Sequence, residues 1–226
     1  MIIKRISRAI KHGLWLFVAF KELSAQEIES IGRVDVVEGI VEVIRSDGTR
    51  IILTKGADVY QNDTIITSTG SSIGITFVDD TIFSLGENGE MVIDELIYDN
   101  IQHAGKFSAN IIMGVFSFIS GEISKSSVDA MTIKTPVATL GIRGTKIVGK
   151  AAPEGSENTI SLLPETDREG NTIVGELVVN NAAGTVVLNQ VGATVKMTSS
   201  FQPPPPPTIS SQQEIQQSFG ETLTTL

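Results

Sequence analysis

The sequence predicts an all-β fold, a single β-sandwich or β-roll of many short strands. From Ile31 onward, apolar and polar residues alternate in short runs, which is the period of a strand with one buried face. Turn residues recur about every 8 to 12 positions, as they do in sandwiches and barrels. The chain has 21 glycines and only 5% aromatic residues, a composition that favours short strands and tight turns. A β-helix is the alternative architecture.

The alternating segments are expected to form strands in the order in which they occur. Asp47–Gly48 and Lys55–Asp58 predict turns between the first three strands, because Asp and Gly tolerate the backbone angles of tight turns. Later strands are predicted within DTIITS, SSIGITFV, TIFSLG, MVIDELIY, GKFSANIIMGVFSFISGEI, MTIKTPVATLGIRGTKIVGKA, NTISLLP and TIVGELVVNNAAGTVVLNQVGATVKMTS.

Four regions are predicted along the chain. They are a basic leader over 1–30, a β domain over 31–150, a β extension over 151–200 that packs on the same domain, and a proline-rich linker with a polar tail over 201–226. The five prolines Pro203–Pro207 predict a stiff extended spacer, because proline cannot join a helix interior or a central strand. We expect a flexible tail after them, with one short helix from Ser210 to Phe219 that ends at Gly220.

The leader is basic and contains a short apolar run. Five of the 17 basic residues and none of the 26 acidic residues lie in Met1–Lys21. The run Gly13–Phe20 is shorter than the roughly 20 residues that span a bilayer, but it is long enough for the core of an export signal. An amphipathic helix on an anionic membrane surface is the second interpretation. An unstructured leader is the third.

Charge and composition exclude several classes of function. The net charge of -9 argues against nucleic-acid binding, because an acidic surface repels phosphate. The absence of cysteine excludes disulfides and thiolate chemistry. His12 and His103 lie far apart without the spacing of zinc ligands, so no metal and no other cofactor is predicted. Turn geometry explains Asp47, Asp79 and Asp80 better than calcium binding does.

The chain is expected not to be an enzyme. Asp94 and Glu95 are adjacent on a predicted strand and would point to opposite faces. Glu38 and Glu42 could share one face as a glycosidase-like pair, although solvated carboxylates at strand edges are far commoner. The segment GIRGTK lacks the spacing of a phosphate-binding loop, and no GxSxG nucleophile motif occurs.

The segment TPVATLGIRGT places an arginine, Arg143, in an otherwise apolar predicted strand. Its proline fixes the strand entry, and its two glycines mark a bulge or a close backbone approach. A bulge could turn the arginine inward to clasp a carboxylate, for which the candidates are Asp79, Asp80 and Asp94. A ligand or partner contact is the alternative. The predicted structural motif and candidate interaction site comprises Thr135, Pro136, Gly141, Arg143, Gly144 and Thr145.

The same segment resembles the closing motif of FecR-type domains, a bacterial envelope family. The run GADVYQNDTIITSTGSSIGITFVDDTIFSLGENGEMVID resembles the characteristic centre of that family, and GIVEVIRSDGTRIIL resembles its opening hairpin. Asn62–Asp63 stands where Gly-Asp is commoner, and VDDT replaces the commoner Asp-Gly hairpin. The resemblance extends from Ile31 to Val148, within the β domain predicted over 31–150.

The resemblance implies an all-β, non-enzymatic, extracytoplasmic domain. In the regulators that name the family, such a domain passes a signal from an outer-membrane receptor to a cytoplasmic anti-sigma segment, and similar domains begin long secreted or surface-anchored proteins. The first hypothesis is therefore an interaction module in the periplasm, at the cell surface or in a secreted protein, which recognises protein or glycan through its loops. The second is a FecR-type signalling regulator, and the third is a carbohydrate-active enzyme. A cytoplasmic location is the alternative, and the leader could add a peripheral membrane contact.

Overall fold

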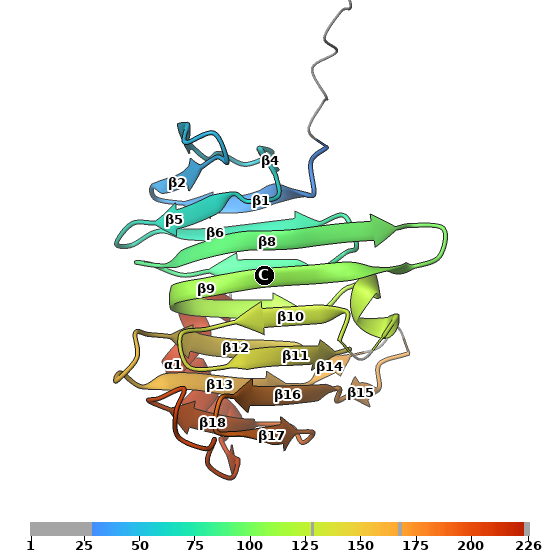
Figure 1. The fold of residues 1–226 in the computed structure, drawn as a ribbon, viewed down its shortest axis with the longest axis vertical. Helices are drawn as coiled ribbons and strands as arrows, with labels where there is room; N and C mark the ends of the chain where they lie inside the picture. The colour runs from blue at the N-terminus through green and yellow to red at the C-terminus, as the bar shows by residue number, and fades with distance from the viewer. Residues whose placement is uncertain (1–28, 128, 167–168, 224–226) are drawn as a thin grey trace, which may run out of the picture.

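The computed structural model describes residues 29–127, 129–166 and 169–223. Within them, seventeen strands form one continuous hydrogen-bonded system, which confirms the predicted all-β class. Figure 1 shows the strands lying across the long axis of the molecule and stacked along it. The strands form two layers that enclose one hydrophobic core, which is the arrangement of a β-sandwich.

Two sheets make up the sandwich, and each is a row of strands that pair with their neighbours. Sheet A contains, in spatial order, β4 (Asp58–Val59), β1 (Gly32–Glu38), β6 (Ser72–Phe77), β7 (Ile82–Leu85), β9 (Ala104–Ile119), β12 (Lys146–Ala151), β13 (Asn158–Leu163), β18 (Ala193–Met197) and β19 (Thr208–Ile209). Sheet B contains β3 (Arg50–Ile52), β2 (Val41–Ile44), β5 (Thr64–Thr67), β8 (Glu90–Asp99), β9 again, β10 (Met131–Lys134), β11 (Thr139–Arg143), β16 (Glu176–Asn181) and β17 (Gly184–Leu188).

The long strand β9 belongs to both sheets. Its first part pairs with β8 and β10, and its second part pairs with β7 and β12. Gly114 stands at the crossing with φ +110°, and a Cβ there would lie 2.6 Å from the Cα of Gly89. Among the described strand pairs of the two sheets, only β9–β10 is parallel. The other described strand pairs therefore lack the parallel pairing that defines a β-helix.

Phenylalanine rings fill the centre of the core. Phe107, Phe116 and Phe118 are all buried on β9. Phe107 contacts Phe118 at 5.5 Å and Phe77 at 5.2 Å between ring centroids. Only Ser117 separates Phe116 from Phe118, so these two rings lie on the same face of the strand.

The C-terminal region packs onto the sandwich, contrary to the flexible tail that the prolines suggested. After Pro203–Pro207 the chain forms β19, and then α1 (Gln212–Leu223) lies against sheet A. Ile215 and Phe219 of α1 pack on Val148 and Leu163. The helix extends through Gly220, which was predicted to end it, because Phe219 and the following turn are held by this contact.

The remaining regions complete the described chain. Strands after residue 151 continue both sheets, and a separate small pair is formed by β14 (Glu165–Thr166) and β15 (Thr172–Ile173). The predicted leader helix falls within residues 1–28, outside the described residues. Among the helices that the structure describes, none has the length and apolar character needed to cross a membrane.

Candidate interaction site at one end of the strands

A buried aspartate, Asp79, organises the turn between β6 and β7. Its side chain is 1% exposed. One carboxylate oxygen accepts the N–H of Thr81 at 3.2 Å, and the other accepts the Thr81 hydroxyl at 2.8 Å. An Asp side chain that binds the backbone two residues ahead fixes a tight turn, so Val78–Thr81 has one defined conformation.

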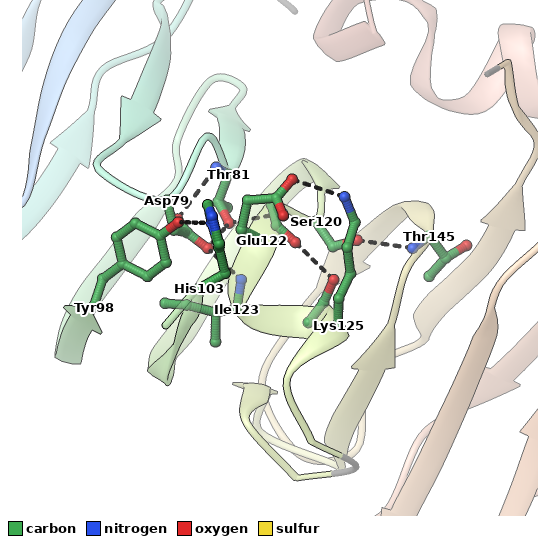
Figure 2. A network of polar contacts seen from close by, with 11 residues as sticks. Asp79, Thr81, Tyr98, His103, Ser120, Glu122, Ile123, Lys125 and Thr145 are labelled. Carbon is green, nitrogen blue, oxygen red and sulfur yellow. Dashed lines mark hydrogen bonds and ion pairs between the residues drawn. The ribbon is translucent and has the colours of Figure 1, made fainter. Parts of the chain in front are cut away.

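The same aspartate also holds the short helix that follows β9, η1 (Glu122–Lys125). The Ile123 N–H donates to the Asp79 carboxylate at 3.4 Å, and the Gly121 N–H donates to the Thr81 hydroxyl at 3.0 Å. Figure 2 shows Asp79 and Thr81 beside Ile123 of this helix. At Gly121 a Cβ would lie 2.1 Å from the Asp79 carbonyl oxygen, so only glycine permits this approach.

The network reaches the C-terminal end of the predicted TPVATLGIRGT motif. The Thr145 N–H donates to the Ser120 hydroxyl at 2.8 Å, and the Ser120 N–H donates to the Thr145 carbonyl at 3.2 Å. Thr145 itself is fully buried. The motif therefore contributes one of its residues to the support of η1.

Next to this support, the hairpin between β8 and β9 presents exposed apolar side chains. Ile101 is 88% exposed and Ile97 is 60% exposed. The Asp99 carboxylate accepts the Ile101 N–H at 2.8 Å and thereby orders the turn. The Tyr98 hydroxyl lies 3.2 Å from Nδ1 of His103, and Figure 1 shows the hairpin extending beyond the neighbouring strands. We call the hairpin tip, the β6–β7 turn and η1 together the Asp79 rim.

The Asp79 rim is acidic. Burial raises the pKa of Asp79, against the opposing effect of the hydrogen bonds from Thr81 and Ile123. Desolvation raises the pKa of the Tyr98 hydroxyl, and the nearby charges of Glu122, Asp79 and Asp80 raise it further. The rim thus combines exposed aliphatic side chains with nearby carboxylates.

The structure gives Arg143 a different partner from the three that were predicted. Arg143 on β11 is the cross-strand neighbour of Glu176 on β16, and the two side chains form an ion pair. Each is 37% exposed, so the arginine does not turn into the core. The reason is register: outward positions on neighbouring strands face each other directly, whereas Asp79 lies at the opposite sheet's β6–β7 turn.

The two other predicted partners do not pair with Arg143 either. Asp94 on β8 pairs with Lys134 at 3.2 Å across β9. Asp80 is exposed in the β6–β7 turn with φ +64°, a left-handed conformation that Asp tolerates better than most residues. The prediction that Arg143 pairs with Asp79, Asp80 or Asp94 is therefore wrong.

The motif does not gather into one site. Thr135 forms a turn with Ala138 before β11 by a 2.8 Å backbone hydrogen bond, and Pro136 lies within that turn. Gly141 lies in the middle of β11 opposite Val178, and Gly144 follows the strand with φ +58°. The segment runs from one side of sheet B to the other, so its two ends lie in different loops.

An arginine that does clasp a buried carboxylate is found elsewhere, in a place that the sequence analysis missed. Arg45 pairs with Asp63, which is 1% exposed, and donates to the Asp58 carbonyl at 3.1 Å. The Tyr60 N–H donates to the Asp63 carboxylate at 2.8 Å, and the Arg45 guanidinium lies 4.8 Å from the centre of the Tyr60 ring. The available signal was Asp63 itself, the aspartate of the Asn62–Asp63 pair that stands where Gly-Asp is commoner in FecR-type domains.

Carboxylates that could have acted as a catalytic pair lie on different sheets. Glu38 ends β1 in sheet A, where it lies 3.5 Å from the Ser72 hydroxyl. Glu42 lies on β2 in sheet B and pairs with Arg50 at 3.3 Å. In the part of the chain that the structure describes, no group of three or more His, Asp or Glu side chains is placed to hold a metal ion.

These features define an all-β domain in which buried polar side chains fix the loops and leave apolar groups exposed. Residues 63–164 match the family model described as FecR protein. The matched region runs from Asp63 through β13 and covers less than half of the 226 residues. It begins later than the resemblance at Ile31 and ends slightly beyond Val148, so both ends of the sandwich lie outside the matched region.

Three solved structures are similar to parts of the chain. One, described as a cell surface anchoring domain, shares 27% identity over 27% of this chain and 82% of its own, with a TM-score of 0.27. Two structures of a proposed anti-sigma factor from Parabacteroides distasonis share 13% identity over 67% of this chain, with TM-scores of 0.49 and 0.47. The alignment covers 62% of each anti-sigma factor chain. A comparison with curated protein sequences found no match.

Proposed function

We propose that the chain is a non-catalytic interaction module that acts outside the cytoplasm, at the bacterial envelope or cell surface, and binds a partner protein through the Asp79 rim. The match of residues 63–164 to the FecR family model supports the envelope location. The observation that carries the binding role is the ordered hairpin tip with Ile97 and Ile101 exposed.

An exposed isoleucine on an ordered turn favours protein binding for two reasons. Water contact with its side chain is unfavourable, so burial against a partner contributes about 25 cal/mol per Å² of apolar surface. The turn is already fixed by Asp99, so little conformational entropy is lost when the partner binds. The isoleucine side chains offer no hydrogen-bonding groups, which favours a protein surface over a glycan.

The charge of the site indicates the chemistry of the partner. Asp80 and Asp99 are exposed on the rim, and the whole chain carries a net charge of -9. A partner with an apolar patch flanked by basic residues would complement it and would be attracted at long range. A FecR-type signalling role is the second candidate function, and the family match favours it; a membrane receptor or its anti-sigma segment would then be the partner.

Location and binding can be tested together in the cell that produces the protein. Cell fractionation with N-terminal sequencing should place the protein outside the cytoplasm. A photo-reactive amino acid at position 101 should cross-link to one partner, and Ile97→Asp should abolish that cross-link. The same reactive group at Ile52, which is exposed on β3 at another part of sheet B, is the matched control.

Each result bears on a separate part of the proposal. A protein that remains in the cytoplasm with Met1 intact would contradict the envelope assignment. Equal cross-linking from positions 52 and 101 would contradict the role of the rim. Cross-linking to an outer-membrane receptor or an anti-sigma protein would favour the signalling function over a general surface module.

A further inference from the structure

Four strands form the ends of the two sheets, and one of them differs from the others. β4 and β19 end sheet A with two residues each. β3 ends one side of sheet B with three residues and carries Arg50, whose charge discourages strand pairing. β17 ends the other side with five residues, GTVVL, which include no charge and no proline. Among the described strands, β17 pairs only with β16.

The backbone of β17 offers hydrogen-bonding groups along its outer edge. The Gly184 N–H points back toward β16, because it donates to the Asn181 side chain at 3.1 Å. Alternate residues of a strand direct their N–H groups to opposite sides. The N–H groups of Thr185 and Val187 therefore point away from β16, toward the unpaired edge. Pro203 and Pro204 lie close to Gly184, so the available edge is Thr185–Leu188.

The surroundings of this edge are uncharged in a strongly acidic chain. No charged residue occurs from Leu177 to Val195, although the chain has a net charge of -9. Val187, Val191 and Ile209 are exposed at this end, and Ile209 lies beside Gly192. A second copy can approach this end without the repulsion that the rest of the acidic surface would cause.

We propose that β17 is a self-association site, at which a second copy of this chain pairs its own β17 antiparallel across a twofold axis. The two B sheets then join into one continuous sheet. Thr185 of one copy lies opposite Val187 of the other, so the outward N–H groups of both strands find carbonyl partners. The self-complementary arrangement closes after two copies and forms no fibre.

The size of the contact sets its strength. One short strand pair with a few exposed aliphatic side chains buries less than the roughly 1,200 Å² of a stable specific interface. We therefore expect a weak dimer with a dissociation constant on the order of 100 μM. This site lies outside the FecR match, so it is independent of the Asp79 rim and of the function proposed for it.

Sedimentation velocity of the purified full chain, from about 1 μM to about 1 mM, tests the proposal directly. The wild type should shift from monomer to dimer with concentration. Val187→Pro should weaken the dimer by at least about tenfold, because it removes an outward N–H without breaking the pairing to β16. Val187→Lys should act in the same direction through charge repulsion, and Ile52→Lys on β3 is the matched control. Circular dichroism checks that each variant folds.

Cross-linking gives the geometry of the contact. The chain has no cysteine, so a single cysteine at Val187 should be linked between copies by a short bis-maleimide, whereas one at Ile52 should not. A monomer throughout the concentration range would overturn the proposal. So would a dimer that resists both Val187 variants, or one that Ile52→Lys dissociates, because either would place the contact on another surface.

Discussion

Two arginine–carboxylate ion pairs link neighbouring segments of the same sheet, but they differ in burial and in the number of additional hydrogen bonds. Arg45 and Asp63 are 18% and 1% exposed, and the carboxylate also accepts a backbone N–H. Arg143 and Glu176 are each 37% exposed, and Nε of Arg143 is buried without a hydrogen-bond partner among the described residues. The first pair is part of a network, whereas the second is a single contact between neighbouring strands.

The comparison shows that burial and additional hydrogen bonds, rather than the ion pair itself, decide what an arginine contributes. An exposed pair gains little, because water screens its attraction and two long side chains lose freedom. Removing a buried carboxylate leaves its hydrogen-bond donors without an acceptor, which is costly. Asp63 and Asp79 belong to this second kind, although only Asp63 has a cationic partner.

The largest expected effect is that of Asp63→Ala. We expect it to lower the free energy of unfolding by about 3 kcal/mol, because it leaves the Arg45 guanidinium and the Tyr60 N–H without their acceptor. Urea denaturation followed by circular dichroism measures this change. Glu176→Ala in the other pair is the matched control. Equal losses in the two variants would contradict the distinction between the pairs.

A second variant tests the Asp79 network, which has no arginine at all. Thr81→Val keeps the size of the side chain but removes a hydroxyl that donates to Asp79 and accepts the Gly121 N–H. We expect a loss of about 2 kcal/mol in the free energy of unfolding. Thr139→Val, at an exposed position on β11, should change it little. If both variants were neutral, the buried network would not stabilise η1.

The pH dependence of stability gives a smaller effect with a defined sign. Because burial raises the pKa of Asp79 above its ordinary value of 3.8, the folded state binds a proton more tightly than the unfolded state. The resulting stabilisation is fully present below the unfolded pKa and is lost as the pH rises through the folded pKa. Urea denaturation at a series of pH values should show a larger loss in the wild type than in Asp79→Asn, which retains Asp63 and Glu165, two carboxyls whose pKa burial also raises.

The charge-matched control is Asp80→Asn, since Asp80 is the exposed neighbour of Asp79 and asparagine also tolerates its left-handed conformation. A change of equal size in Asp80→Asn would show that the effect does not come from the buried carboxylate.

Local patterns predicted much of the fold because strands and tight turns depend on neighbouring residues. The Asp47–Gly48 turn is present: Gly48 has φ +85°, and the Thr49 N–H donates to the Asp47 carboxylate at 2.8 Å. The packing of the tail could also have been inferred. Ser211 and Glu214 form a capping box, and Ile215 and Phe219 have the spacing of one helix face. The five prolines and the polar residues around them favoured a tether instead.

The partners of charged residues could not be predicted, because they depend on which strands become neighbours. Arg143 and Glu176 lie 33 positions apart, and Arg45 and Asp63 lie 18 apart. Alternation in the sequence places each side chain on a face of its strand but does not give the order of strands in the sheet. The prediction that Arg143 turns inward to clasp a carboxylate was therefore wrong, and the arginine that pairs with a buried carboxylate is Arg45.

The smallest expected effect is that of Arg143→Gln, and it separates the two arginines most clearly. We expect a loss of about 0.5 kcal/mol in the free energy of unfolding, because the pair with Glu176 is half exposed and glutamine can still cross to the neighbouring strand. Raising the salt concentration should reduce the difference from the wild type further, since mobile ions screen exposed charges. Arg45→Gln, measured under the same conditions, should be several times more destabilising and should keep most of its effect at high salt. A loss for Arg143→Gln as large as that for Arg45→Gln would contradict the distinction between the two pairs.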